Sequence, residues 1–142
     1  MNQATKSKYS VIGIFNTNIL MVLTAGFLGI LGFAALFLPQ EILDHYGLAS
    51  TDLSVILMKI TGALYLGFSV LNWMARSNII GAIYSRPVAL GNFMHFTIVT
   101  IILLRYLTSN EITSEFVIGA AIYSIFAICF GYLLFGGKRA CQ

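Results

Sequence analysis

The stretch VIGIFNTNILMVLTAGFLGILGFAALFL, from Val11 to Leu38, runs for 28 residues without a charge. As an α-helix it would extend about 42 Å, at roughly 1.5 Å per residue, against a bilayer hydrocarbon core of about 30 Å. Apolar residues make up 58% of the chain, whereas soluble domains contain roughly 45–50%. The sequence therefore predicts an all-α membrane protein, a single four-transmembrane-helix bundle over residues 1–142 with helices at 11–38, 53–75, 87–107 and 112–135.

Charged residues are sorted by sign between the segments that flank these helices. The N-terminal, middle and C-terminal segments hold six basic residues and no acid: Lys6, Lys8, Arg76, Arg86, Lys138 and Arg139. The other two connecting segments hold all five acids: Glu41, Asp44, Asp52, Glu111 and Glu115. Because cytoplasmic loops carry an excess of Lys and Arg, we predict that both termini and the middle loop are cytoplasmic.

The ends of the expected helices carry recognisable signals. Pro39 lacks a backbone N–H and is expected to end the first helix, and the acidic segment after it to form a short helical turn on the outer interface. Asp52 is expected to cap the second helix. Pro87 suits the first turn of the third helix, and Thr108 with Glu111 has capping-box spacing for entry to the fourth.

Small residues recur along one face of each expected helix. In lipid no hydrophobic force drives helices together, so small side chains that let backbones approach mark the contact faces. The packing residues predicted on this basis are Gly29, Gly32, Gly62, Gly91 and Gly131. Such spacing is common and by itself names no function.

Two basic residues lie on the acidic side of the expected topology. Lys59 is expected about 10 Å along the second helix from its outer end. A charge at that depth requires either a partner of opposite charge or a side chain that extends to the interface. It could snorkel outward to Asp52 or Asp44. Alternatively, Lys59 and Arg105 could form a cation site for a lipid phosphate or a carboxylate.

Three strong polar side chains are expected at similar depth in the inner half of the bundle. Asn92 and His95 share one face of the third helix, and Asn72 on the second helix reaches a similar level. A hydrogen-bonded packing cluster is one interpretation. A proton-relay or ligand-binding site is the other, because ionisable groups inside a membrane are functional candidates.

Several function classes lack the residues they need. No acid lies within a helix core, and one histidine without a nearby carboxylate makes neither a metal site nor a catalytic dyad. We therefore expect no catalytic residue, no metal and no cofactor. The basic residues are spread over three short segments, which favours anionic lipid headgroups over nucleic acid as partners. Eleven Phe and seven Tyr residues could line a pocket for a flat apolar ligand.

Two segments carry a resemblance to known proteins. The sequence KITGALYLGFSVLNWMAR (Lys59–Arg76), followed by RPVALGNFMHF (Arg86–Phe96), resembles a pattern in small four-helix bacterial membrane proteins of uncharacterised function. In size and topology the chain is broadly similar to DoxX-like proteins. The resemblance implies a multi-pass protein of the bacterial inner membrane and carries no agreed activity.

These observations lead to one expected function and one alternative. We expect a non-enzymatic accessory or lipid-associated protein whose partners are membrane lipids, with a homo-oligomer or a membrane-protein partner as further possibilities. The alternative is a binder or carrier of a small hydrophobic or amphipathic ligand, a quinone or a lipid, held between the helices.

Overall fold

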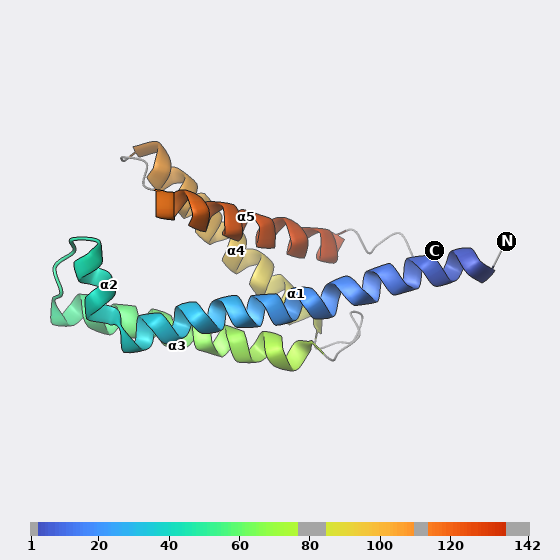
Figure 1. The fold of residues 1–142 in the computed structure, drawn as a ribbon, viewed down its shortest axis with the longest axis horizontal. Coiled ribbons are helices and arrows are strands. Elements are labelled where there is room, and N and C mark those ends of the chain that lie inside the picture. Colours follow the sequence, from blue (N-terminus) through green and yellow to red (C-terminus); the bar gives the residue numbers. More distant parts are fainter. Residues whose placement is uncertain (1–2, 77–84, 110–113, 136–142) are drawn as a thin grey trace. The chain divides into compact units, whose positions relative to one another are not determined.

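The computed structural model describes residues 3–76, 85–109 and 114–135, with the side chains of the first helix described from Thr17 onward. These residues form five α-helices and no strand (Figure 1). Four segments are long and apolar enough to cross a membrane: Thr17–Phe37, Asp52–Ala75, Arg86–Thr108 and Ser114–Phe135. The prediction of an all-helical chain with four candidate membrane spans is confirmed.

The first helix is longer than its apolar stretch. α1 (Gln3–Phe37) begins well before the expected start at Val11. The physical reason is that hydropathy marks the part of a helix suited to lipid, while the polar residues before it have no lipid signal and still continue the helix. The predicted start at Val11 was therefore wrong, because the first apolar residue does not mark the first helical residue.

Pro39 opens a helix as well as closing one. α1 ends at Phe37, and α2 (Pro39–His45) starts at the proline, whose missing N–H is no loss at a first helical position. The segment expected to form one short turn is thus a seven-residue helix. Gly47 ends it with φ +65°, a left-handed conformation that glycine adopts without strain. The Leu48 N–H then donates to the Leu43 carbonyl at 2.9 Å.

The cap of the next helix differs from the prediction. α3 (Asp52–Ala75) has Thr51 as its N-cap, because Thr51 is extended and its Oγ1 accepts a hydrogen bond from the Ser54 N–H at 3.2 Å. The expectation that Asp52 caps this helix was wrong. Asp52 occupies the first turn instead, where the helix dipole favours a negative charge.

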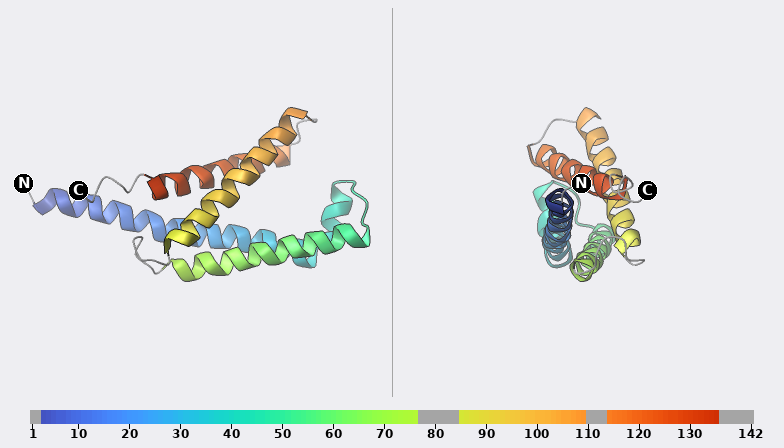
Figure 2. Two further views of the ribbon diagram at one scale, coloured as in Figure 1. Left: turned by 180° about the vertical axis from the view of Figure 1, so that it is seen from behind. Right: turned by 90° about the vertical axis from the view of Figure 1, so that its right-hand side faces the viewer.

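The chain divides into two compact units, Met1–Ser77 and Asn78–Gln142. In the first unit, α1 and α3 lie side by side and antiparallel, and α2 packs against both (Figures 1 and 2). The second unit contains α4 (Ser85–Ser109) and α5 (Ser114–Phe135), which contact each other. The structure thus defines two helical hairpins, and their assembly into one bundle stays a prediction.

The boundary between α4 and α5 corrects one further expectation. Thr108 lies inside α4, and its hydroxyl donates to the Arg105 carbonyl at 2.8 Å. It therefore does not cap the following helix. Glu111, the other member of the expected capping box, lies outside the described residues. α5 begins at Ser114 with Glu115 in its first turn.

Aromatic rings join α4 to α5 along their length. Phe93 meets Phe135 near one end, with ring centroids 5.8 Å apart, and Tyr106 meets Phe116 near the other at 4.7 Å. This pairing of early with late residues fixes an antiparallel hairpin. Offset and edge-to-face rings at such distances attract each other beyond their buried area. Aromatic packing therefore holds the second hairpin, whereas glycine contacts hold the first.

Candidate functional site

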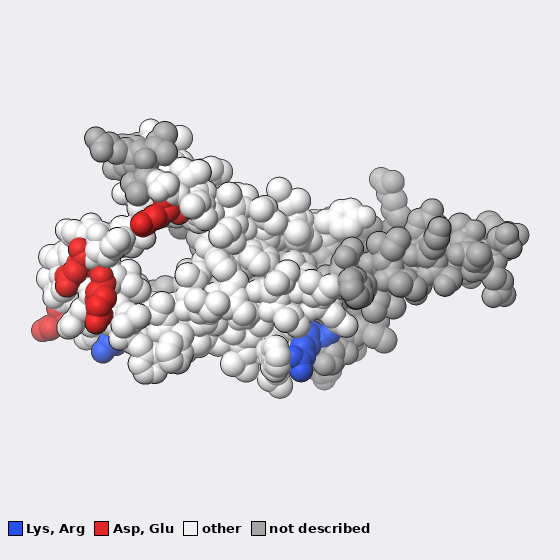
Figure 3. Space-filling model, viewed as in Figure 1, with Lys and Arg blue, Asp and Glu red and all other residues white. Residues whose placement is uncertain are grey.

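Acidic side chains gather at one end of the first unit, where Lys59 is the one described Lys or Arg residue. The acids Glu41, Asp44 and Asp52 gather over α2 and the start of α3, whereas Arg76 follows the end of α3 (Figure 3). The Arg76 guanidinium carbon lies 3.5 Å from the centroid of the Trp73 ring. This cation–π pair places an amphipathic ring and a positive charge together at the basic end, as interfacial anchors do.

The backbones of α1 and α3 touch at two glycines. A Cβ atom built on Gly32 would lie 2.8 Å from the Gly62 carbonyl oxygen and 2.8 Å from the Leu66 nitrogen. A Cβ on Gly62 would lie 2.8 Å from the Gly32 oxygen. Both contacts are with backbone atoms, which cannot swing aside, so any side chain at either position would separate the helices.

A hydrogen bond between helices lies about two turns further along the same contact. The Ser69 hydroxyl donates to the Ala25 carbonyl at 2.7 Å. A Cβ on Gly29 would come within 3.0 Å of that hydroxyl oxygen. Gly29 therefore leaves the space in which Ser69 reaches across to α1, and the predicted packing residues Gly29, Gly32 and Gly62 share one interface.

The other two predicted packing glycines belong to the second hairpin. Gly131 on α5 faces Phe93 of α4, since a Cβ there would lie 3.1 Å from the ring. Here the neighbour is a side chain, so the contact is less restrictive than at Gly32. Gly91 lies half-buried on α4.

Lys59 lines an open hollow in the first unit. We call this the Lys59 hollow; it measures about 430 Å³ and lies where α1 ends, α2 begins and α3 passes. The hollow is an open surface depression, because most of the side chains that line it are exposed. Its walls combine apolar, polar and charged side chains: Phe37, Pro39, Gln40, Glu41, Val55 and Lys59.

The acids predicted as partners of Lys59 do not reach it. Within the part of the chain that the structure describes, the Lys59 ammonium is within 4.0 Å of no carboxylate. Asp44 is engaged locally, because its Oδ1 accepts a hydrogen bond of 2.6 Å from the Ser50 hydroxyl. Arg105 belongs to the second hairpin, where it is exposed on α4. A joint cation site of Lys59 and Arg105 stays a prediction.

Both predicted asparagines are fully buried and bond within their own helices. Asn72 donates from Nδ2 to the Phe68 carbonyl at 2.9 Å, and Asn92 donates to the Val88 carbonyl at 2.8 Å. Each amide thus meets a carbonyl one turn earlier, which lowers the cost of placing it in hydrocarbon. Asn72 belongs to the first unit and Asn92 to the second, so their association stays a prediction.

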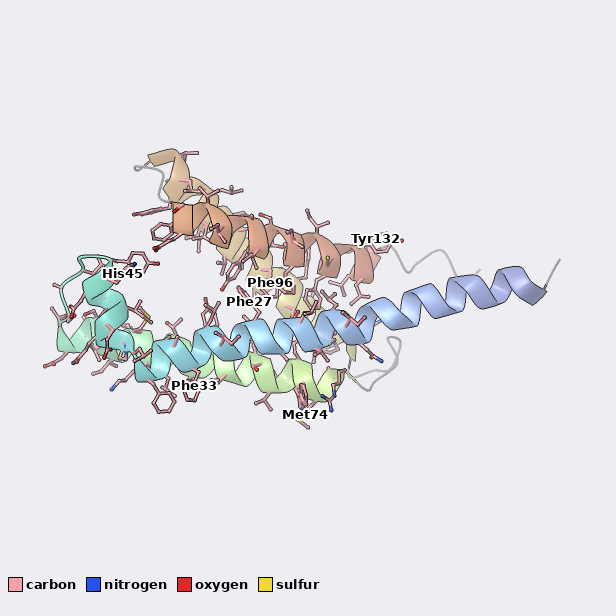
Figure 4. The ribbon with its side chains drawn as sticks, in the orientation of Figure 1. Phe27, Phe33, His45, Met74, Phe96 and Tyr132 are labelled. Atoms are coloured by element: carbon pink, nitrogen blue, oxygen red, sulfur yellow. The ribbon has the colours of Figure 1, made fainter. Side chains whose placement is uncertain are left out.

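His95 lies beside an aromatic cluster of the second hairpin. Its ring centroid is 5.2 Å from that of Phe96 and 6.0 Å from that of Tyr123 on α5. Phe96, labelled in Figure 4, also stacks on Phe126 at 4.9 Å and on Phe130 at 5.9 Å. Phe96 and Phe130 are completely buried, so these rings fill the space between the helices rather than lining an opening.

Sequence reasoning predicted that Lys59 contacts an acid of the first outer loop, Glu41, Asp44 or Asp52, or a bound anion, and it missed Gln40 as a neighbour. Asp52 and Asp44 seemed the natural partners because they lie in the segment that leads into α3. The available signal was Pro39: a proline that starts a new helix directly after α1 turns the next residues over the first turns of α3. Val55 and Lys59, four residues apart, then present one helical face to that turn.

No match for this chain was found among protein-family models, characterised proteins or solved structures.

Proposed function

We propose that this chain is a multi-pass protein of a bacterial inner membrane that acts without catalysis as a lipid-associated accessory protein. In this proposal all four candidate spans cross the bilayer as one bundle, and both termini and the basic ends face the cytoplasm. Asn72, Asn92 and His95 then meet inside the bundle. The segregation of acids from basic residues along the sequence supports this orientation.

The observation that carries the proposal is the apolar exterior of both hairpins. Large hydrophobic side chains lie exposed on every candidate span, among them Ile30 at 73%, Leu64 at 61%, Ile101 at 59% and Ile128 at 71%. Phe33 and Met74 likewise project away from the α1–α3 pair (Figure 4). Apolar surface of this extent is costly in water and requires acyl chains or a protein partner to cover it.

Lipid association has a second support in the charge at Lys59. Lys59 is exposed about two turns from the start of a candidate span. A phosphate group at the headgroup level would lower the electrostatic cost of this cation. The closed packing of Phe96 and Phe130 supports lipid around the helices over a flat ligand, such as a quinone, within the α4–α5 hairpin.

Native mass spectrometry of the protein released from mild detergent tests this proposal. We expect discrete phospholipid adducts that persist through successive detergent washes, on a monomer, a homo-oligomer or a complex with a membrane-protein partner. Release of the bare chain, without phospholipid, would refute lipid association. A stoichiometric adduct with the mass of a quinone would instead favour the ligand-carrier alternative.

A further inference from the structure

The Lys59 hollow has two chemically distinct sides. Phe37, Pro39 and Val55 supply apolar surface, whereas Lys59, Glu41 and Gln40 supply one positive charge, one negative charge and one amide. A site of this composition suits an amphipathic molecule whose polar part carries both signs of charge. The charges of Lys59 and Glu41 cancel formally. An anionic ligand would pair with Lys59 but would be repelled by the Glu41 carboxylate.

Among the described side chains of the first unit, no ion pair satisfies either charge of the hollow. Glu41 and Lys59 line the same space, yet neither forms an ion pair with the other or with another side chain among residues 17–76. The neighbouring acids have other roles: Asp44 accepts from Ser50, and Asp52 lies in the first turn of α3. The hollow therefore presents one cation and one carboxylate that remain available to a ligand.

In the proposed topology, Lys59 lies near the phosphate level of a bilayer. Seven residues separate it from Asp52, the first residue of α3, which places it about 10 Å along the helix. The polar layer on each face of a bilayer is about 5–7 Å thick, so the Lys59 backbone lies near the boundary with the acyl chains. Its flexible stem lets the ammonium rise to a phosphate.

We propose that the Lys59 hollow binds the head group of a zwitterionic phospholipid that carries a primary amine, a phosphatidylethanolamine. Its phosphate contacts Lys59, and its ammonium contacts Glu41 and the side-chain oxygen of Gln40. The acyl chains continue along the apolar surface beside Phe37. This inference rests on the proposed lipid association and names the class of lipid.

The primary amine is the distinguishing feature of this ligand. An ethanolamine ammonium has N–H groups that donate charge-assisted hydrogen bonds to a carboxylate. A choline head group has the same charge but no N–H, and a glycerol head group has no cation to place against Glu41. The hollow should therefore prefer ethanolamine over both choline and glycerol head groups.

A competition experiment tests this preference. The full chain is reconstituted in nanodiscs that contain equal amounts of phosphatidylethanolamine, phosphatidylcholine and phosphatidylglycerol with identical acyl chains, and native mass spectrometry records the lipids retained on the protein. We expect about tenfold enrichment of phosphatidylethanolamine, the gain from one charge-assisted hydrogen bond. Glu41→Gln should abolish the preference over phosphatidylcholine, and Lys59→Met should reduce retention of all three lipids at this site.

Asp52→Asn is the matched control. It removes one acid from the same end of the first unit but lies outside the lining of the hollow, so the preference should survive. Equal retention of the three lipids by the wild type, or a preference that Glu41→Gln leaves intact, would overturn the inference while leaving lipid association standing. A wild-type chain that retains no phospholipid would overturn the proposed function itself.

A second measurement uses only the wild-type chain, so it does not depend on any variant folding. A phosphatidylethanolamine with a photoreactive group near its amine is cross-linked in the same nanodiscs, and the attachment sites are mapped by peptide mass spectrometry. Cross-links should concentrate on residues 36–41 and 55–59. Cross-links confined to other segments would contradict the proposed site.

Discussion

A methyl group at Gly32 should weaken the first hairpin by an amount that its geometry sets. The Cβ of Gly32→Ala would lie 2.8 Å from two backbone atoms of α3, whereas ordinary contact begins at 3.4 Å. Because backbone atoms cannot rotate away, α1 and α3 must separate by the difference, 0.6 Å. A gap of 0.5–1 Å forfeits about a quarter to a half of the dispersion energy of each neighbouring contact. Overpacking of this kind costs about 1–3 kcal/mol.

The control for this prediction is Gly26→Ala on the same helix. Alanine is a better helix former than glycine by about 1 kcal/mol in water, and a Cβ on Gly26 would meet nothing within 4 Å. Both variants carry the same change in helix propensity, so their difference isolates the contact between α1 and α3. Gly62→Ala with Gly67→Ala forms a matching pair on α3, because Gly67 is also open.

Reversible unfolding in mixed micelles, followed by circular dichroism, measures the free energy of unfolding of each variant. Gly32→Ala should be less stable than Gly26→Ala by about 1–3 kcal/mol. The reasoning fails if the two alanine variants are equally stable, because the close approach of α1 and α3 would then contribute nothing to stability.

The remaining predictions concern one half-buried side chain, Ser69, and two buried ones, Thr24 and Phe96. Ser69→Ala should cost about 0.6 kcal/mol, and at most about 1.7, in the same unfolding assay, because it removes the 2.7 Å hydrogen bond to α1. Thr24→Val should be neutral or stabilising, because the Thr24 hydroxyl is buried with no hydrogen-bond partner among the described residues; a loss as large as that of Ser69→Ala would contradict this. Phe96→Ala should cost about 3 kcal/mol, the low end for a buried aromatic, because lipid supplies no hydrophobic drive between helices. The exposed Ile128→Ala is its control, and an equal effect of the two would refute the aromatic packing of α4 on α5.

The sequence predicted the four candidate spans because length and hydropathy determine them. It predicted the ends of the helices less well, for local reasons. Thr51 and Asp52 are adjacent and both are able to cap, and the backbone conformation at Thr51 decides between them. Thr108 was expected to cap a new helix, but its hydroxyl bonds to the preceding turn instead. Such choices depend on backbone geometry that residue type alone does not specify.

The candidate site was only partly accessible from the sequence. Glycine spacing singled out Gly32 and Gly62 on separate helices, but the register that brings them together is a property of the folded pair. For Lys59, proximity along the chain suggested Asp52 and Asp44. The path of α2 brings Glu41 to the same hollow instead, because Pro39 starts a helix and changes the direction of the chain.

The measurement that tests the central claim most directly is cysteine accessibility across the membrane. In a background where Cys129 and Cys141 are replaced by serine, single cysteines are introduced as Ala49→Cys, in the acidic segment, and Ser77→Cys, in the basic middle loop. Intact cells are treated with a membrane-impermeant maleimide, with and without permeabilisation of the inner membrane. A multi-pass protein with cytoplasmic termini should be labelled at Ala49→Cys in intact cells and at Ser77→Cys only after permeabilisation. Labelling of Ser77→Cys in intact cells, or none of Ala49→Cys, would contradict the account.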